Sequence, residues 1–97
     1  MSNPFKTLED LTEEEYQAFI AKQDELSALK LSPEEWDKML FDNACKLVQE
    51  QDLITADVLQ LNLYTGYATA TRLIGELESA GLIARVPGSL RLYAPVR

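Results

Sequence analysis

The last part of the sequence changes its hydrophobic period, and this change limits the fold more than any other feature. Up to residue 80, apolar side chains recur every three or four residues, as on one face of a helix. Gly81 fits the left-handed position that ends a helix, and the runs 82–86 and 90–93 then indicate two short strands. Pro87-Gly88 between these runs is a turn signal. A chain of 97 residues that ends in this way has room for one helical core closed by a hairpin.

Capping residues mark where the helices before the hairpin begin. Thr12-Glu13-Glu14-Glu15 fits a capping box and predicts a helix to about Leu29, and Ser32-Pro33-Glu34-Glu35 predicts another to about Glu50. Thr55 can cap a short helix to about Leu61, and a further helix is expected over 67–80. The inward face of that last helix is expected to carry Tyr67, Ala70, Leu73, Ile74 and Leu77.

The order of these elements predicts the architecture. From residue 32 the chain reads helix, short helix, helix and hairpin, which is the layout of a winged helix-turn-helix domain. We therefore expect a mainly α protein with a small β-hairpin, in which a winged helix-turn-helix carries an extra N-terminal helix. The expected division is an acidic helical extension over residues 1–31 and the winged-helix domain over residues 32–97.

Charge is unevenly distributed between the two parts of the chain. The sequence has 16 acidic and 9 basic residues, a formal charge of −7. Residues 1–42 hold eleven acidic and four basic side chains, and residues 43–97 hold five of each, so the whole excess lies in the first part. This balance disfavours a protein that coats nucleic acid through a basic field. The neutral second part can still approach DNA or an uncharged protein surface.

Residue usage gives no support for an enzyme. The chain has no histidine and one cysteine, Cys45, so we expect no catalytic residues, no metal site and no intrachain disulfide. We also find no phosphate loop or cofactor motif, and expect no cofactor. No apolar run approaches the roughly 20 residues that span a bilayer, and no secretory signal is recognisable at the start. These features predict a cytoplasmic protein that does not bind membranes.

A set of short motifs runs through residues 40–95: Leu40-Phe41-Asp42-Asn43-Ala44, Gly66-Tyr67, Ala70, Arg72-Leu73-Ile74, Glu78-Ser79-Ala80-Gly81-Leu82-Ile83 and Ala94-Pro95. In these motifs the chain resembles the gamma domain of FtsK/SpoIIIE-type DNA translocases. The resemblance implies a winged helix whose helix over 67–80 reads the short DNA sequences that orient a translocase. It also implies contact with the tyrosine recombinase XerD, which switches on recombination at the chromosome dimer site. A free-standing copy resembles the recombination activation factors of phages and other mobile elements.

The sequence departs from the family pattern at positions linked to DNA. The family usually has Asn at the position of Ala68 and Glu at that of Gly75, whereas Arg72 fits its pattern. Leu61 and Tyr64 stand where the family often has basic residues. Asn pairs with adenine through two hydrogen bonds and basic residues hold phosphates, so both losses weaken the expected hold on DNA.

The candidate site residues follow from this comparison. Expected DNA contacts are Arg72, Thr69, Thr71 and Ala68 on the helix over 67–80, and Arg85 and Arg91 in the wing. Expected partner contacts are Leu61, Tyr64 and Gly75. Two alternatives remain open. Arg72 can instead pair with Glu76 one turn on, and Leu61 and Tyr64 can instead pack on the N-terminal helix.

Three functions are compatible with the sequence. The first is an accessory factor that contacts a XerD-type recombinase and activates site-specific recombination. The second is a sequence-specific regulator that binds double-stranded DNA through Arg72. The third is a protein-binding or DNA-mimicking inhibitor that uses the acidic N-terminal helix, although most charged helix faces are simply solvated.

Overall fold

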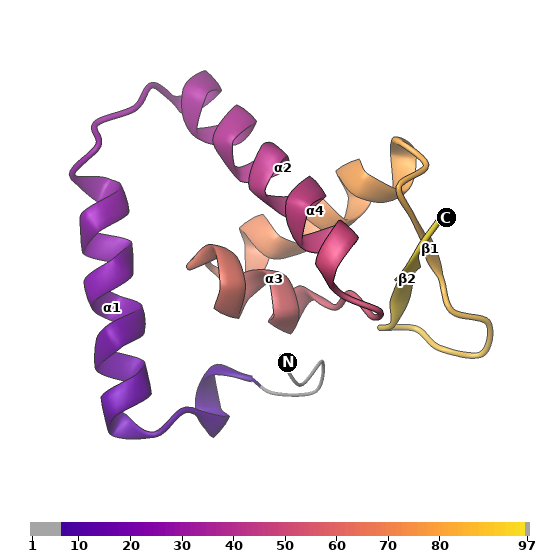
Figure 1. Ribbon diagram of the computed structural model, residues 1–97, viewed down its shortest axis with the longest axis horizontal. Coiled ribbons are helices and arrows are strands. Elements are labelled where there is room, and N and C mark those ends of the chain that lie inside the picture. Colours follow the sequence, from indigo (N-terminus) through magenta and orange to yellow (C-terminus); the bar gives the residue numbers. More distant parts are fainter. Residues whose placement is uncertain (1–6, 97) are drawn as a thin grey trace.

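The computed structural model describes residues 7–96 and shows four α-helices followed by a two-stranded hairpin (Figure 1). The elements are η1 (Leu8–Asp10), α1 (Glu13–Ser27), α2 (Pro33–Glu50), α3 (Ala56–Leu63), α4 (Tyr67–Ser79), β1 (Ile83–Arg85) and β2 (Tyr93–Pro95). The expected mainly α fold with a small β-hairpin, arranged as a winged helix, is confirmed.

Three of the helices begin at the capping residues that the sequence marks. The side chains of Thr12, Ser32 and Thr55 accept hydrogen bonds from backbone N–H groups in the first turns of α1, α2 and α3. Such caps satisfy backbone donors that a helix start leaves without a partner. In α2 the Glu35 carboxylate accepts in return from the backbone N–H of Ser32 at 3.1 Å. This bond lowers the pKa of Glu35, because it favours the charged carboxylate.

The hydrophobic core lies among α2, α3, α4 and the hairpin. Its members come from all of these elements and from Ile54 just before α3. The most deeply buried large side chains are Leu40, Ile54, Val58, Leu59, Leu73, Leu77 and Ile83. Because they come from segments far apart in the sequence, this one cluster fixes α4 and the hairpin relative to α2 and α3.

The hairpin differs from the expected one in its second strand. Ile83, Ala84 and Arg85 pair antiparallel with Pro95, Ala94 and Tyr93, so the second strand is 93–95 and not 90–93. Residues 90–92 belong to the wing loop, and Leu90 is 84% exposed. Toward the turn, the pairing ends with the bond from the Val86 N–H to the Leu92 carbonyl, of 2.9 Å, because the Pro87-Gly88 turn follows and Pro87 has no N–H to donate. Tyr93 also exchanges two backbone hydrogen bonds with Ile54, of 2.7 and 2.9 Å. The alternation of Leu90 and Leu92 therefore does not mark strand residues.

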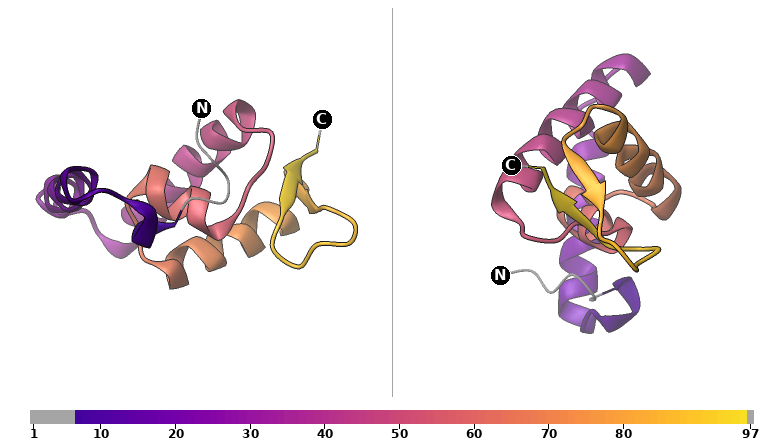
Figure 2. Two further views of the ribbon diagram at one scale, coloured as in Figure 1. Left: turned by 90° about the horizontal axis from the view of Figure 1, so that it is seen from below. Right: turned by 90° about the vertical axis from the view of Figure 1, so that its right-hand side faces the viewer.

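Helix α1 lies to one side of this arrangement. Figures 1 and 2 place it at the opposite end of the molecule from the hairpin, with α3 and the start of α4 between them. Phe19 is the buried residue of α1, and it does not belong to the core cluster. Helix α1 therefore packs through a separate, smaller contact.

Candidate nucleic-acid and partner interface

The outward face of α4 has very small residues on both sides of Arg72. Ala70, Leu73, Ile74 and Leu77 are buried as expected. Ala68, Arg72 and Gly75 are exposed, and their spacing of four and three residues places them on one face. Tyr67 was expected to face the core, but it is 58% exposed at the first position of α4. A ligand that approaches these three residues therefore meets Arg72 between two very small residues, with the exposed Glu76 beside it.

Arg72 is held by acidic residues of this same chain. Its Nη2 atom lies 2.8 Å from Oδ1 of Asp37 in α2, and its Nε atom lies 3.9 Å from Oε1 of Glu76. The expected pairing with Glu76 thus forms, and the contact with Asp37 is the shorter of the two. All three side chains are about half exposed, so such pairs contribute little to stability, at most about 1 kcal/mol each.

The two threonines of α4 lie in different surroundings. The Thr71 hydroxyl donates to the backbone carbonyl of Tyr67 at 2.9 Å, so its proton is already used within the helix. Thr69 is half-buried and lines a pocket that faces α1. Ala68 offers only a methyl group, which can make apolar contact but no hydrogen bond. Among these three residues, no side chain presents a free charge to a phosphate.

The wing arginines also have partners within the chain. Arg85 donates from Nη2 to the Tyr93 hydroxyl at 3.3 Å and lies over its ring, 5.7 Å from the centroid, and the hydrogen bond raises the pKa of Arg85. Arg91 Nη2 lies 3.3 Å from Oδ2 of Asp57, near the start of α3. The side chain of Asp57 is 12% exposed and that of Arg91 is 75% exposed. The wing therefore presents one guanidinium whose charge is matched by a largely buried carboxylate.

Tyr64 forms the turn between α3 and α4 and is the point that α1 contacts. Its backbone is left-handed, with φ 58° and ψ 42°, which a non-glycine residue adopts at a cost. Its ring centroid lies 5.6 Å from that of Phe19, and its carbonyl accepts from Nε2 of Gln23 at 3.1 Å. Packing on the N-terminal helix, the alternative left open for Tyr64, is thus observed.

The other two expected partner residues lie apart from this contact. Leu61 is half-buried in the last part of α3. Gly75 is exposed more than two turns along α4, and a Cβ atom built there meets nothing within 4 Å. The structure therefore does not bring Gly75 and Tyr64 into one cluster.

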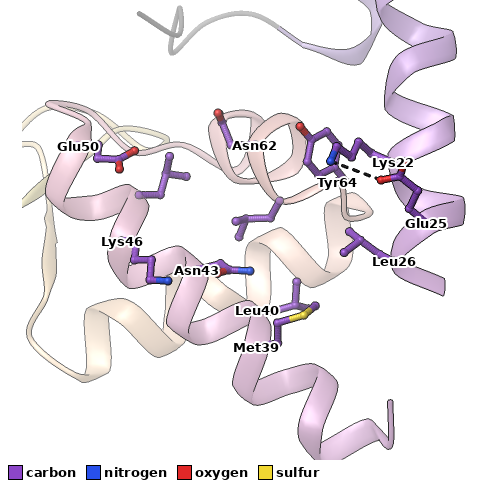
Figure 3. Close-up of a pocket in the computed structure, with 12 residues that line it drawn as sticks. Lys22, Glu25, Leu26, Met39, Leu40, Asn43, Lys46, Glu50, Asn62 and Tyr64 are labelled. Carbon is purple, nitrogen blue, oxygen red and sulfur yellow. Dashed lines mark ion pairs between the residues drawn. The ribbon is translucent and has the colours of Figure 1, made fainter. Parts of the chain in front are cut away.

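Two pockets flank the contact of α1 with the rest of the molecule. One, of about 330 Å³, lies among Lys22, Glu25, Leu26, Met39, Asn43, Lys46 and neighbouring residues of α2 and α3, with an ion pair of 3.4 Å between Lys22 and Glu25 (Figure 3). The other, of about 370 Å³, is lined by Gln23, Asp24, Leu26, Ser27, Trp36, Tyr64, Thr65, Gly66 and Thr69. The Thr65 hydroxyl is buried and has no hydrogen-bond partner among residues 7–96.

Sequence reasoning left open that Tyr64 packs on the N-terminal helix, but it did not name the α1 residues that make this contact. Phe19, Gln23 and Leu26 recur at spacings of four and three residues, so a single helix face was recognisable. Nothing local to α1 indicated that this face would meet the turn at Tyr64, because the two segments lie about 40 residues apart in the sequence, as the bond between Gln23 and Tyr64 shows.

Other chemistry has little support in the part of the chain that the structure describes. Burial raises the pKa of the Cys45 thiol, and Asp42 adds to the shift, so the nucleophilic thiolate is disfavoured. Within residues 7–96 no three His, Cys, Asp or Glu side chains gather where they could hold a metal ion. None of the helices described there has the length and apolarity that crossing a bilayer requires.

Comparison with known proteins gives two findings. A family model described as "Ftsk gamma domain" matches residues 35–91, from the first turn of α2 to the wing. A DNA translocase FtsK from Halalkalibacterium halodurans is 38% identical over 56 residues, which are 58% of this chain. The matched part is 7% of the translocase, so the chain spans only a small fraction of that relative. No solved structure matches the chain significantly.

Proposed function

The chain belongs to the FtsK gamma domain family, and from this premise we propose that it is a non-enzymatic accessory factor that contacts a XerD-type tyrosine recombinase. The contact would activate site-specific recombination, as the family resemblance implies. In this proposal residues 32–97 act as the winged-helix domain, residues 1–31 are an acidic extension, and the protein works in the cytoplasm as an activation factor of a mobile element.

One observation carries the proposal: two of the three arginines of the expected DNA face, Arg72 and Arg91, are paired with carboxylates inside the chain, whereas Arg85 contacts the neutral Tyr93. Arg72 pairs with Asp37 and Glu76, and Arg91 pairs with Asp57. Phosphate contacts by unpaired cations supply most of the non-specific affinity for DNA. A winged-helix face on which most of the positive charge is already paired is better suited to contact a protein that is itself bound to DNA than to hold DNA directly.

The proposal is tested by a gel-shift titration on a fluorescent Xer recombination site, with this protein alone and with purified XerD. We expect a further shift only when XerD is present. A protein that neither shifts the XerD complex nor stimulates recombination by it would refute the proposal.

Matched variants at Gly75 locate the contact. The Cβ of Gly75→Ala has free space, and the longer Gly75→Gln side chain extends from the same exposed position. If a partner approaches α4 at this point, Gly75→Gln weakens the shift with XerD more than Gly75→Ala does. Equal effects of the two variants would place the recombinase contact elsewhere, toward Leu61 or Tyr64.

A second candidate function is a regulator that binds double-stranded DNA directly. It is favoured by the exposure of Arg72, whose surface ion pairs are weak enough for a phosphate or a base to replace. This function predicts binding to duplex DNA without XerD that falls steeply with salt and that Arg72→Ala weakens. Binding that salt does not change, or no binding, would exclude it.

A further inference from the structure

We propose that α1 is an autoinhibitory arm that docks on the turn between α3 and α4 and screens the N-terminal end of α4 from DNA. The inference rests on the proposed DNA-related role of the fold and assigns a regulatory part to the extension. Releasing α1 would then uncover the end of α4 that a helix-turn-helix protein brings to DNA.

The docking contact is specific to the turn. Phe19 is 6% exposed, and its ring meets that of Tyr64 at 5.6 Å. One helical turn later, Gln23 donates its side-chain N–H to the carbonyl of the same residue at 3.1 Å. Both contacts end on Tyr64, the left-handed residue that joins the two helices. Helix α1 is therefore fixed on the turn and not on the core cluster, to which Phe19 does not belong.

The position of α1 places it across the approach to α4. The pocket of about 370 Å³ has Asp24 and Ser27 of α1 on its wall together with Gly66 and Thr69 at the start of α4. In helix-turn-helix proteins the first residues of the second helix contact base edges in the major groove. A DNA duplex and α1 would therefore compete for the same end of α4.

The charges reinforce this competition. Helix α1 has five acidic residues and one lysine, a net charge of −4. The start of α4 is capped by Gly66, which offers no side-chain hydrogen bond, and the first turn contains no acidic residue. The positive end of the α4 dipole is thus uncompensated within its own helix, and it would attract a phosphate. In the docked state, Asp24 lies on the wall of the pocket beside this end and repels phosphates.

The arm is held weakly enough to be released. At the turn, α1 is held by the ring contact and the hydrogen bond to Tyr64, and pockets of about 330 and 370 Å³ lie on both sides of this contact. Phe19 is the one buried residue among those of α1, whereas α2 buries four. The capping box at Thr12 and Glu15 lies within α1 and does not depend on docking. Helix α1 can therefore leave the turn without disturbing the core.

The test measures binding of the full-length chain to a fluorescent duplex by anisotropy, without recombinase, at low and moderate salt. Phe19→Ala removes the ring contact, and we expect the affinity at low salt to rise at least about fivefold. Asp24→Asn keeps the contact and removes the charge, and we expect a rise of about two- to fivefold. Glu14→Gln is the matched control, because it makes the same charge change in α1 at a residue outside both pockets, and it should have little effect.

Trp36 gives an independent signal for release of the arm. It is the one tryptophan of the sequence and lines the pocket that contains Asp24. Undocking of α1 by Phe19→Ala should therefore change its fluorescence in the absence of DNA. Gln23→Ala, which removes only the hydrogen bond to Tyr64, should produce a smaller change in the same direction.

The results separate the two proposals. A change in Trp36 emission with Phe19→Ala, accompanied by tighter DNA binding, supports the arm. The same change without tighter binding overturns it, and so does unchanged emission with unchanged binding. If the unaltered protein gives no shift with XerD, the proposed function is contradicted instead. That result does not affect the comparison of DNA affinity between the variants and the unaltered protein.

Discussion

Helices α1 and α2 begin with the same kind of capping box, but they are attached to the rest of the molecule to very different extents. Thr12 and Glu15 cap α1 as Ser32 and Glu35 cap α2, with hydrogen bonds of nearly equal length. Yet α2 contributes four buried residues to the core, whereas α1 buries Phe19 alone and outside that cluster. A capping box determines where a helix starts, and it does not determine how firmly the helix is attached.

The largest difference should appear when buried side chains are truncated in the two regions. Leu73 is fully buried between α4 and the rest of the core, so Leu73→Ala should lower the free energy of unfolding by about 2–5 kcal/mol. Phe19→Ala should cost much less, because its contact lies outside the core. Urea denaturation of both variants measures this difference. Equal losses of unfolding free energy in the two variants would mean that α1 and the core unfold as one unit, and would contradict the difference in attachment.

The next difference concerns the caps. Thr55 is buried and caps α3 inside the core, so Thr55→Ala should cost about 0.5–2 kcal/mol of global stability. Thr12→Ala removes an equivalent cap from α1 and should reduce helix content with little change in the midpoint of core unfolding. Circular dichroism together with thermal melting distinguishes the two effects. A Thr12→Ala variant whose melting falls as far as that of Thr55→Ala would contradict the weak attachment of α1.

A smaller effect, of opposite sign, is expected on the exposed face of α4. Gly75→Ala places a methyl group where nothing lies within 4 Å and removes the flexibility of a mid-helix glycine, so it should stabilise the core by about 0.5–1 kcal/mol. The measurement is the urea midpoint of Gly75→Ala, made both in the unaltered protein and in the Phe19→Ala variant. The gain should persist when α1 is undocked, since Gly75 lies far from the turn. A destabilised variant would indicate a close neighbour that the structure does not contain.

The smallest effect is the pH dependence of the α2 cap. The pKa of Glu35 is lowered by the hydrogen bond from the backbone N–H of Ser32, so the folded state binds its proton less readily than the unfolded state. The resulting stabilisation is complete above the ordinary glutamate value of about 4.3 and is lost as the pH falls through the lower folded-state pKa. Glu35→Gln should abolish this contribution. Urea midpoints for both proteins across the acidic range give the test, and identical pH profiles would exclude a role for the carboxylate.

Local patterns predicted the elements better than the contacts between them. Thr12, Ser32 and Thr55 start the helices because capping depends on residues within one turn. The second strand was placed three residues too early, and the pairing of its first residue, Tyr93, with Ile54, 39 positions before it, was not foreseen. Alternation along the strand contains no information about that partner.

The same limit applies to the candidate site. The spacing of Arg72 and Glu76 predicted their contact, but the shorter contact of Arg72 is with Asp37, 35 residues earlier. The partners of Arg91 and Tyr64 are also distant in the sequence. A helix face identifies which side chains are available, and only the assembled fold determines which of them are already engaged.

The pair of Arg91 and Asp57 links the wing loop to the first turn of α3. A guanidinium has five N–H donors, and the contact of 3.3 Å uses one nitrogen, Nη2, while the side chain stays 75% exposed. The contact favours one placement of this long side chain before anything binds, so a ligand oxygen that joins it from solvent has less ordering to impose. Because the carboxylate of Asp57 balances the charge, the pair would guide where a partner sits on the wing without drawing it in from a distance.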